Sequence, residues 1–154
     1  MATYYADTSV LVKQHVDEIG SSWVRTTLDA AAGHHIAVSR LAEVELVAAF
    51  ARRAREGTLV GESLARAEDD AQRLGAQVYS WIELSSEVVE RAQLLVRSYT
   101  LRTLDALHLA SALLVAEQFS AATLPALTFL AADERLLAAA QAEGLATDNP
   151  NAHP

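Results

Sequence analysis

Short apolar runs alternate with helix-like segments along this chain, and that alternation limits the folds open to it. Runs at 3–6, 36–38, 77–82 and 127–131 have the length and composition of buried strands. Between them lie longer segments, several opened by serine or aspartate and closed by glycine, as helices commonly are. Helices are expected over 21–32, 39–56, 61–74, 86–99, 103–117 and 133–143. This order predicts βαβ units, in which helices cover both faces of a parallel sheet.

The expected fold class is therefore α/β, with three α/β/α layers around a central, mostly parallel sheet of four to five strands. The chain has 154 residues and shows no linker-like stretch or internal repeat. We therefore expect one domain over residues 1–147. Residues 148–154, which contain two prolines and two asparagines, are expected to form a flexible tail.

Composition excludes several classes of function. The chain has no cysteine, which rules out disulfides, thiolate catalysis and zinc ribbons. No apolar run is long enough for a membrane span, and no basic-then-apolar leader is present, so we expect a cytoplasmic protein without membrane contact. The net charge of −8 argues against broad electrostatic binding of nucleic acid.

Acidic residues stand where the predicted strands end, which is where sites form in parallel α/β sheets. Asp7 and Asp133 follow the first and last expected strands, Glu45 lies in the helix after the second, and Asp105 opens a buried helix. Taken singly, an aspartate at a helix start is usually a cap for free backbone N–H groups. Structural and functional interpretations of each acid therefore both remain open.

Helical neighbours distinguish Glu45 from the nearby Glu43. Glu43 has Arg40 three residues before it, which gives it an ordinary surface ion pair. Glu45 is flanked at three and four residues by Leu41 and three alanines, so no local partner explains its charge. We therefore select Glu45 as the candidate functional acid.

Asp105 lies in a helix that is apolar on almost every side, where an isolated carboxylate is costly. Arg102 and His108, three residues away on either side, are possible partners that would make its role structural. His108 itself is expected to be a hydrogen-bonded core histidine rather than a metal ligand.

Together the four acids indicate a cation site. Two carboxylates about 4 Å apart repel by roughly 4 kcal/mol at an effective dielectric constant of 20. Such a cluster persists by protonation or by binding a hard cation, and all-oxygen ligands favour Mg²⁺ or Mn²⁺ over zinc. The chemistry predicted is metal-assisted phosphodiester hydrolysis.

Four segments resemble PIN-domain ribonucleases of the VapC toxin type. They are Tyr5–Lys13 (YADTSVLVK) with Val38–Leu46, the segment Arg102–Ala110 (RTLDALHLA), and Phe129–Gly144 around Asp133. Two departures from the family pattern fall near the last acid. Ala131 stands where threonine is frequent, and the stretch 117–125 is longer than usual.

The resemblance implies a PIN-like fold, Mg²⁺ or Mn²⁺ dependence, cleavage of RNA, a cognate antitoxin protein and a homodimeric toxin. It also implies that Asp7 and Asp105 contact the metal directly, while Glu45 and Asp133 act through water or a second ion. Ser9 is then expected to orient Asp7 or a bound water.

Basic residues are the candidates for contacts with RNA phosphates. The densest run is Arg52-Arg53-Ala54-Arg55, and Lys13, the only lysine, lies about two turns beyond Asp7. Arg102 is a further candidate. A solvated helix end, favoured by the helix dipole, is the more usual explanation of the arginine run. The overall acidity predicts weak, selective binding of RNA.

Two alternatives remain beside a ribonuclease toxin. One is a catalytically silent PIN-like module that binds a protein partner, although the acids that such a module would be expected to lose are all present. The other is a phosphatase or phosphoacceptor domain that uses Asp7 as nucleophile. It fits poorly, because Ser9 stands where a second aspartate is wanted and no lysine lies late in the chain.

Overall fold

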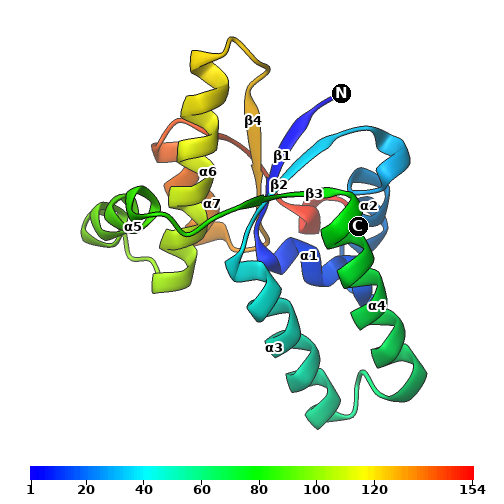
Figure 1. The fold of residues 1–154 in the computed structure, drawn as a ribbon. Coiled ribbons are helices and arrows are strands. Elements are labelled where there is room, and N and C mark those ends of the chain that lie inside the picture. The colour runs from blue at the N-terminus through cyan, green and yellow to red at the C-terminus, as the bar shows by residue number, and fades with distance from the viewer.

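The computed structural model describes all 154 residues and consists of one five-stranded sheet between two layers of helices (Figure 1). The strands are β1 (Thr3–Ala6), β2 (His35–Ser39), β3 (Tyr79–Ile82), β4 (Leu127–Leu130) and β5 (Ala146–Asp148). The helices are α1 (Thr8–His15), α2 (Ser21–Thr27), α3 (Leu41–Glu56), α4 (Gly61–Gln77), α5 (Ser86–Ser98), α6 (Thr103–Ala121) and α7 (Glu134–Ala142). Short 3₁₀ turns cover Ala30–Ala32 and Pro150–Ala152.

All strand pairs are parallel, and the strand order is β3-β2-β1-β4-β5. The expected α/β class and three-layer arrangement are confirmed. Strand β1 lies at the centre, with β2 on one side and β4 on the other, so the ends of these three strands meet at one edge. No helix is both long and apolar enough to cross a membrane.

Two hydrophobic clusters hold the layers together. Helices α5, α6 and α7 pack on one face around Tyr5 and Phe129, whose rings stack with centroids 5.4 Å apart. Helices α1 to α4 pack on the other face around Ile36, Val38 and Phe50. Side chains alternate between the faces of a strand, so neighbouring residues of β1 enter different clusters.

Several boundaries differ from the sequence-based expectation. Helix α2 ends at Thr27, because the Asp29 side chain accepts the Ala31 N–H at 2.7 Å and starts a separate 3₁₀ turn. Helix α4 continues to Gln77, which delays β3 to Tyr79, and helix α6 runs on to Ala121.

The C-terminal segment differs most from its expectation as a flexible tail. Asp148 ends β5, which pairs with β4, and Pro150 is buried. The His153 ring stacks on Trp23 of α2 with centroids 4.3 Å apart. Gly20 permits this packing: its φ is +82°, and a Cβ there would lie 2.2 Å from the Pro150 carbonyl oxygen.

Candidate active site

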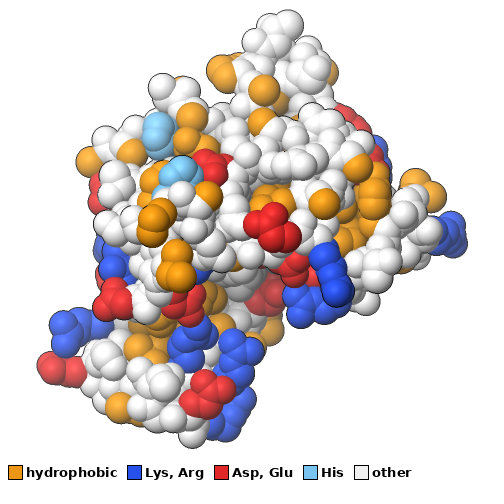
Figure 2. Space-filling model, turned by 180° about the vertical axis from the view of Figure 1, so that it is seen from behind, with side chains coloured by type: hydrophobic (Ala, Val, Ile, Leu, Met, Phe, Trp, Pro, Cys, Tyr) orange, Lys and Arg blue, Asp and Glu red, His pale blue; other side chains and the backbone are white.

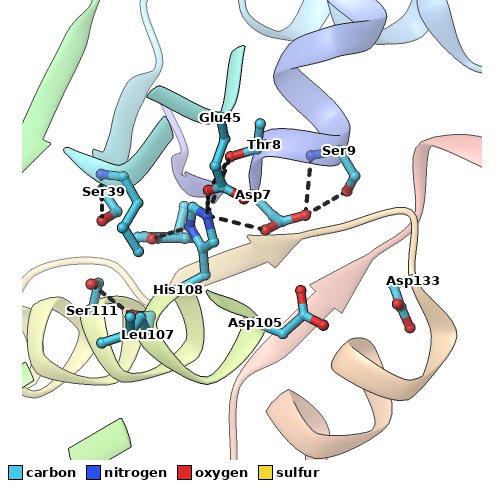
Figure 3. A network of polar contacts seen from close by, with 12 residues as sticks. Asp7, Thr8, Ser9, Ser39, Glu45, Asp105, Leu107, His108, Ser111 and Asp133 are labelled. Atoms are coloured by element: carbon cyan, nitrogen blue, oxygen red, sulfur yellow. Dashed lines mark hydrogen bonds and ion pairs between the residues drawn. The ribbon is translucent and has the colours of Figure 1, made fainter. Parts of the chain in front are cut away.

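Four acidic side chains from the first two turns or N-terminal caps of four helices lie around the carboxyl ends of β1, β2 and β4 (Figure 3). They are the acids selected from the sequence: Asp7, Glu45, Asp105 and Asp133. The structure arranges them as two linked pairs. His108 joins Glu45 to Asp7, and Arg102 joins Asp105 to Asp133.

Asp7 caps helix α1 directly after β1 and is buried. Its Oδ2 accepts hydrogen bonds from the Ser9 backbone N–H at 3.1 Å and from the Ser9 hydroxyl at 2.6 Å. The same hydroxyl oxygen accepts the backbone N–H of Ala132 at 3.1 Å. Ser9 therefore fixes the Asp7 carboxylate relative to the end of β4.

Glu45 turns inward from the second turn of α3, whereas Glu43 is exposed and pairs with Arg40 at 2.9 Å. Glu45 Oε1 accepts the Thr8 hydroxyl at 2.8 Å and lies 2.5 Å from Nε2 of His108. Burial alone would raise the pKa of Glu45, but the hydrogen bond and charge of His108 and the Thr8 hydroxyl lower it. Glu45 is thus held as a carboxylate.

His108 is fully buried in α6 and hydrogen-bonded, as the sequence predicted for a core histidine. Its Nδ1 lies 2.9 Å from the Tyr5 hydroxyl, and its Nε2 lies 3.6 Å from Asp7 Oδ1. Burial alone would lower the pKa of His108, but the Glu45 hydrogen bond and the charges of Asp7 and Glu45 raise it. Sequence reasoning missed that this core histidine contacts two of the candidate acids.

Asp105 lies in the first turn of α6, and Asp133 caps α7 by accepting the backbone N–H groups of Arg135 and Leu136. The Arg102 guanidinium donates to Asp105 at 3.0 Å and lies 3.5 Å from Asp133. Burial raises the pKa of Asp105, the Arg102 contact lowers it, and the nearby charges of Asp7 and Asp133 raise it further. The net effect is a raised pKa, with burial as its largest cause.

The carboxylates share one feature: each has an oxygen that accepts no hydrogen bond from the protein. Protein donors occupy Oδ2 of Asp7, Oε1 of Glu45 and Oδ2 of Asp105. Donors to Asp133 reach Oδ1, leaving Oδ2 with only the longer Arg102 contact. Hydrogen-bonded carboxylates with one available oxygen are typical of metal ligands.

The chemistry of this set fits a hard divalent cation, because every available donor is a carboxylate oxygen. No three acidic or histidine side chains are grouped closely enough to form a complete metal site by themselves. Arg102 stands between Asp105 and Asp133 and supplies a positive charge there. A pocket of about 280 Å³ opens beside this pair, with Thr100, Leu101 and Arg135 also in its lining.

The candidate substrate-binding residues separate into two groups. Lys13 differs from its expectation: it is buried in α1, and its Nζ contacts Glu18 at 3.3 Å and the Ile19 carbonyl at 2.8 Å. Arg53 also pairs with Glu18, at 2.5 Å. Arg52 and Arg55 are exposed and make no ion pair. Figure 2 shows basic and acidic side chains interspersed on the face it presents, without a continuous basic surface.

Comparison with known proteins places this chain in a family. The family model for the PIN domain matches residues 4–142. Ribonuclease VapC49 of Mycobacterium tuberculosis (strain ATCC 25618 / H37Rv) is 38% identical over 145 residues, which cover 94% of this chain and 93% of that protein. Ribonuclease VapC47 of the same species (strain CDC 1551 / Oshkosh) is 30% identical over 150 residues, covering 96% and 97%.

A solved structure agrees in fold. VapBC2 from Rickettsia felis, bound to a DNA fragment from its promoter, matches with a TM-score of 0.60 and 14% identity over 96% of this chain and 98% of that chain. At that identity the likeness concerns the fold alone. The family match and the two relatives cover nearly the whole sequence, and the chain belongs to the PIN-domain family, among the ribonucleases of the VapC type.

Proposed function

We propose that this chain is a metal-dependent endoribonuclease and the toxin component of a toxin–antitoxin pair. The observation that carries the proposal is the set of four carboxylates at one edge of the sheet, each with an oxygen free of protein hydrogen bonds. The relatives that span nearly the whole chain bear the name ribonuclease, which supports RNA as the substrate class.

Asp7 and Asp105 are the direct ligands in this proposal, through their Oδ1 atoms. Both lie in the interior of the site, and the pKa of Asp105 is raised first by burial and then by the charges of Asp7 and Asp133. Glu45 and Asp133 assist through water or a second ion. The oxygen-only donor set favours Mg²⁺ or Mn²⁺.

A cation held there would lower the pKa of a bound water and stabilise negative charge on a phosphodiester. The protein's part is to fix the carboxylates. Ser9 fixes Asp7, the Thr8 hydroxyl helps to fix Glu45, and the start of α7 fixes Asp133 through two backbone N–H groups.

Arg102, Arg52 and Arg55 are the proposed contacts for RNA phosphates. Arg102 is the one at the site itself, and its side chain is 80% exposed. Arg52 and Arg55 lie on the exposed end of α3. Lys13 and Arg53 are left out of this set because both form ion pairs with Glu18. Few free cations on a chain of net charge −8 favour weak, selective RNA binding.

The proposed partners are a cognate antitoxin protein and a second copy of the toxin, and the proposed location is the cytoplasm. Support for an antitoxin comes from similar solved structures described as VapBC or as a toxin–antitoxin complex. A catalytically silent module would have the same fold, so activity decides between the two functions.

The test is cleavage of RNA by the purified chain with Mg²⁺, with Mn²⁺ or with EDTA. Asp7→Asn and Asp105→Asn remove one charge each at the site, and Asp69→Asn removes one on the exposed face of α4 as a matched control. We expect metal-dependent cleavage that both site variants abolish and the control retains. Cleavage that persists in EDTA, or in both site variants, would contradict the metal mechanism. A chain inactive under all conditions would favour the silent module.

A further inference from the structure

His108 is the buried centre of a hydrogen-bond network that reaches the proposed site from the core. Its ring nitrogens contact Tyr5 of β1, Thr8 of α1 and Glu45 of α3, so one side chain of α6 connects three other elements. These contacts join residues 63 to 103 positions apart in the chain. Figure 3 shows the ring between Glu45 and the core, with Asp7 beside it.

The partners of the ring decide where its proton lies. The Tyr5 hydroxyl is buried and lies 2.9 Å from Nδ1, where it can donate its proton to that nitrogen. The carboxylate of Glu45 only accepts hydrogen bonds, and it lies 2.5 Å from Nε2. An unprotonated Nε2 would direct its lone pair at that carboxylate. The contacts therefore require a proton on Nε2.

The same geometry determines which Glu45 oxygen remains available. The bond from His108 Nε2 and the bond from the Thr8 hydroxyl at 2.8 Å both end on Oε1. No protein donor reaches Oε2. Two donors from different helices restrict rotation of the carboxylate, so the occupied and available oxygens are not interchangeable.

We propose that His108 is a positioning residue, whose Nε2–H holds Oε1 of Glu45 and leaves Oε2 available to the cation site beside Asp7. The inference rests on the proposed metal-dependent function and adds a residue outside the acidic set. His108 binds no metal in this account. Hydrogen-bond partners of metal ligands usually change metal affinity or activity 10- to 100-fold when they are removed.

The first test locates the proton. In metal-free protein labelled with ¹⁵N-histidine, NMR distinguishes protonated from unprotonated ring nitrogens, and His108→Gln identifies the His108 signals among those of five histidines. We expect a proton on Nε2. An unprotonated Nε2 would overturn the proposal, and this result does not depend on RNA cleavage.

The second test measures Mn²⁺ affinity by calorimetry, with thermal unfolding as the check on folding. We expect His108→Leu to bind Mn²⁺ about 10- to 100-fold more weakly and to lower kcat rather than raise KM. His108→Gln, which keeps an N–H donor, should recover part of the loss. His35→Leu is the matched control, because His35 is exposed at the start of β2, and its ring contacts Ser80 and Phe119 but none of the candidate acids.

A folded His108→Leu protein with unchanged Mn²⁺ affinity would overturn the proposal. If that variant does not fold, Tyr5→Phe replaces it, because it removes the donor to Nδ1 while keeping the ring that stacks on Phe129. Weaker Mn²⁺ binding by Tyr5→Phe supports the proposal, and unchanged binding contradicts it. Wild-type protein that binds no Mn²⁺ would instead overturn the proposed function, and the role of His108 with it.

Discussion

The Ser9 hydroxyl donates to Oδ2 of Asp7 at 2.6 Å and accepts the backbone N–H of Ala132 at 3.1 Å. One small side chain thus connects the acid after β1 to the loop after β4, 123 residues away. The ends of the two neighbouring strands are held in register by a contact that also orients a proposed metal ligand.

Ser9→Ala should therefore reduce both activity and stability. Loss of the hydroxyl leaves Asp7 with only the backbone N–H of residue 9 on Oδ2, and a 10- to 100-fold loss of Mn²⁺ affinity or cleavage rate is expected. The free energy of unfolding should fall by about 1 kcal/mol. Calorimetry and urea unfolding measure the two effects. A loss of stability with unchanged Mn²⁺ affinity would limit Ser9 to a structural role.

Asp105 should titrate above an ordinary aspartate in the metal-free protein, because burial and the charges of Asp7 and Asp133 raise its pKa. A raised pKa means that the carboxylate takes up its proton at a higher pH as acid is added. Arg102 opposes this effect, so Arg102→Gln should raise the pKa of Asp105 further. Carbon-13 NMR of the side-chain carboxyl follows the titration directly. If the titration midpoint of Asp105 were that of an ordinary aspartate in both the wild type and Arg102→Gln, this description would be contradicted.

Arg102 should weaken the binding of the metal ion and strengthen the binding of RNA. Its guanidinium competes with a cation for Asp105 and Asp133, but the side chain is 80% exposed and such pairs contribute less than about 1 kcal/mol. Arg102→Gln should tighten Mn²⁺ binding by no more than about fivefold and weaken RNA binding. Calorimetry and filter binding at fixed salt measure these changes. Arg97→Gln, on the exposed face of α5, is the control and should change neither.

His15 should make the protein less stable in acid. Its ring packs edge-on against Phe50, its Nε2 has no hydrogen-bond partner, and burial lowers its pKa to about 4. Because the unfolded chain binds the proton more readily, this contribution to stability is present above about pH 6.5 and is lost as the pH falls toward 4. The difference corresponds to roughly 3 kcal/mol.

Urea unfolding between pH 7 and pH 4 measures this effect. His15→Leu should lose less stability over that range than the wild type, whereas His35→Leu should follow the wild type. Parallel pH profiles for His15→Leu and the wild type would contradict the assignment.

Local sequence patterns predicted those parts of the fold that local interactions determine. Asp7 and Asp133 were found because a polar cap follows an apolar run, and both cap helices in the structure. The sequence does not predict strand β5, because its three residues, Ala146–Asp148, are too few for a recognisable apolar pattern. It forms by pairing with the exposed edge of β4.

The rest of the site depends on contacts between residues that are far apart in the sequence, and local patterns could not predict these contacts. Helical spacing correctly gave Glu43 an ion pair with Arg40, but it could not show that His108 holds Glu45 from another helix. Lys13 was expected near a phosphate because it follows Asp7. It is buried instead, and its ammonium group pairs with Glu18 and donates to the Ile19 carbonyl, both in the loop after α1.

The most direct test of the central claim is a crystal structure of the protein soaked in Mn²⁺, with the ion located by its anomalous scattering. The account predicts an ion at roughly 2.0–2.5 Å from Oδ1 of Asp7 and Oδ1 of Asp105, with Arg102 moved away from Asp105. Carboxylates of Asp7 and Asp105 more than about 8 Å apart, with no ion at either, would contradict it.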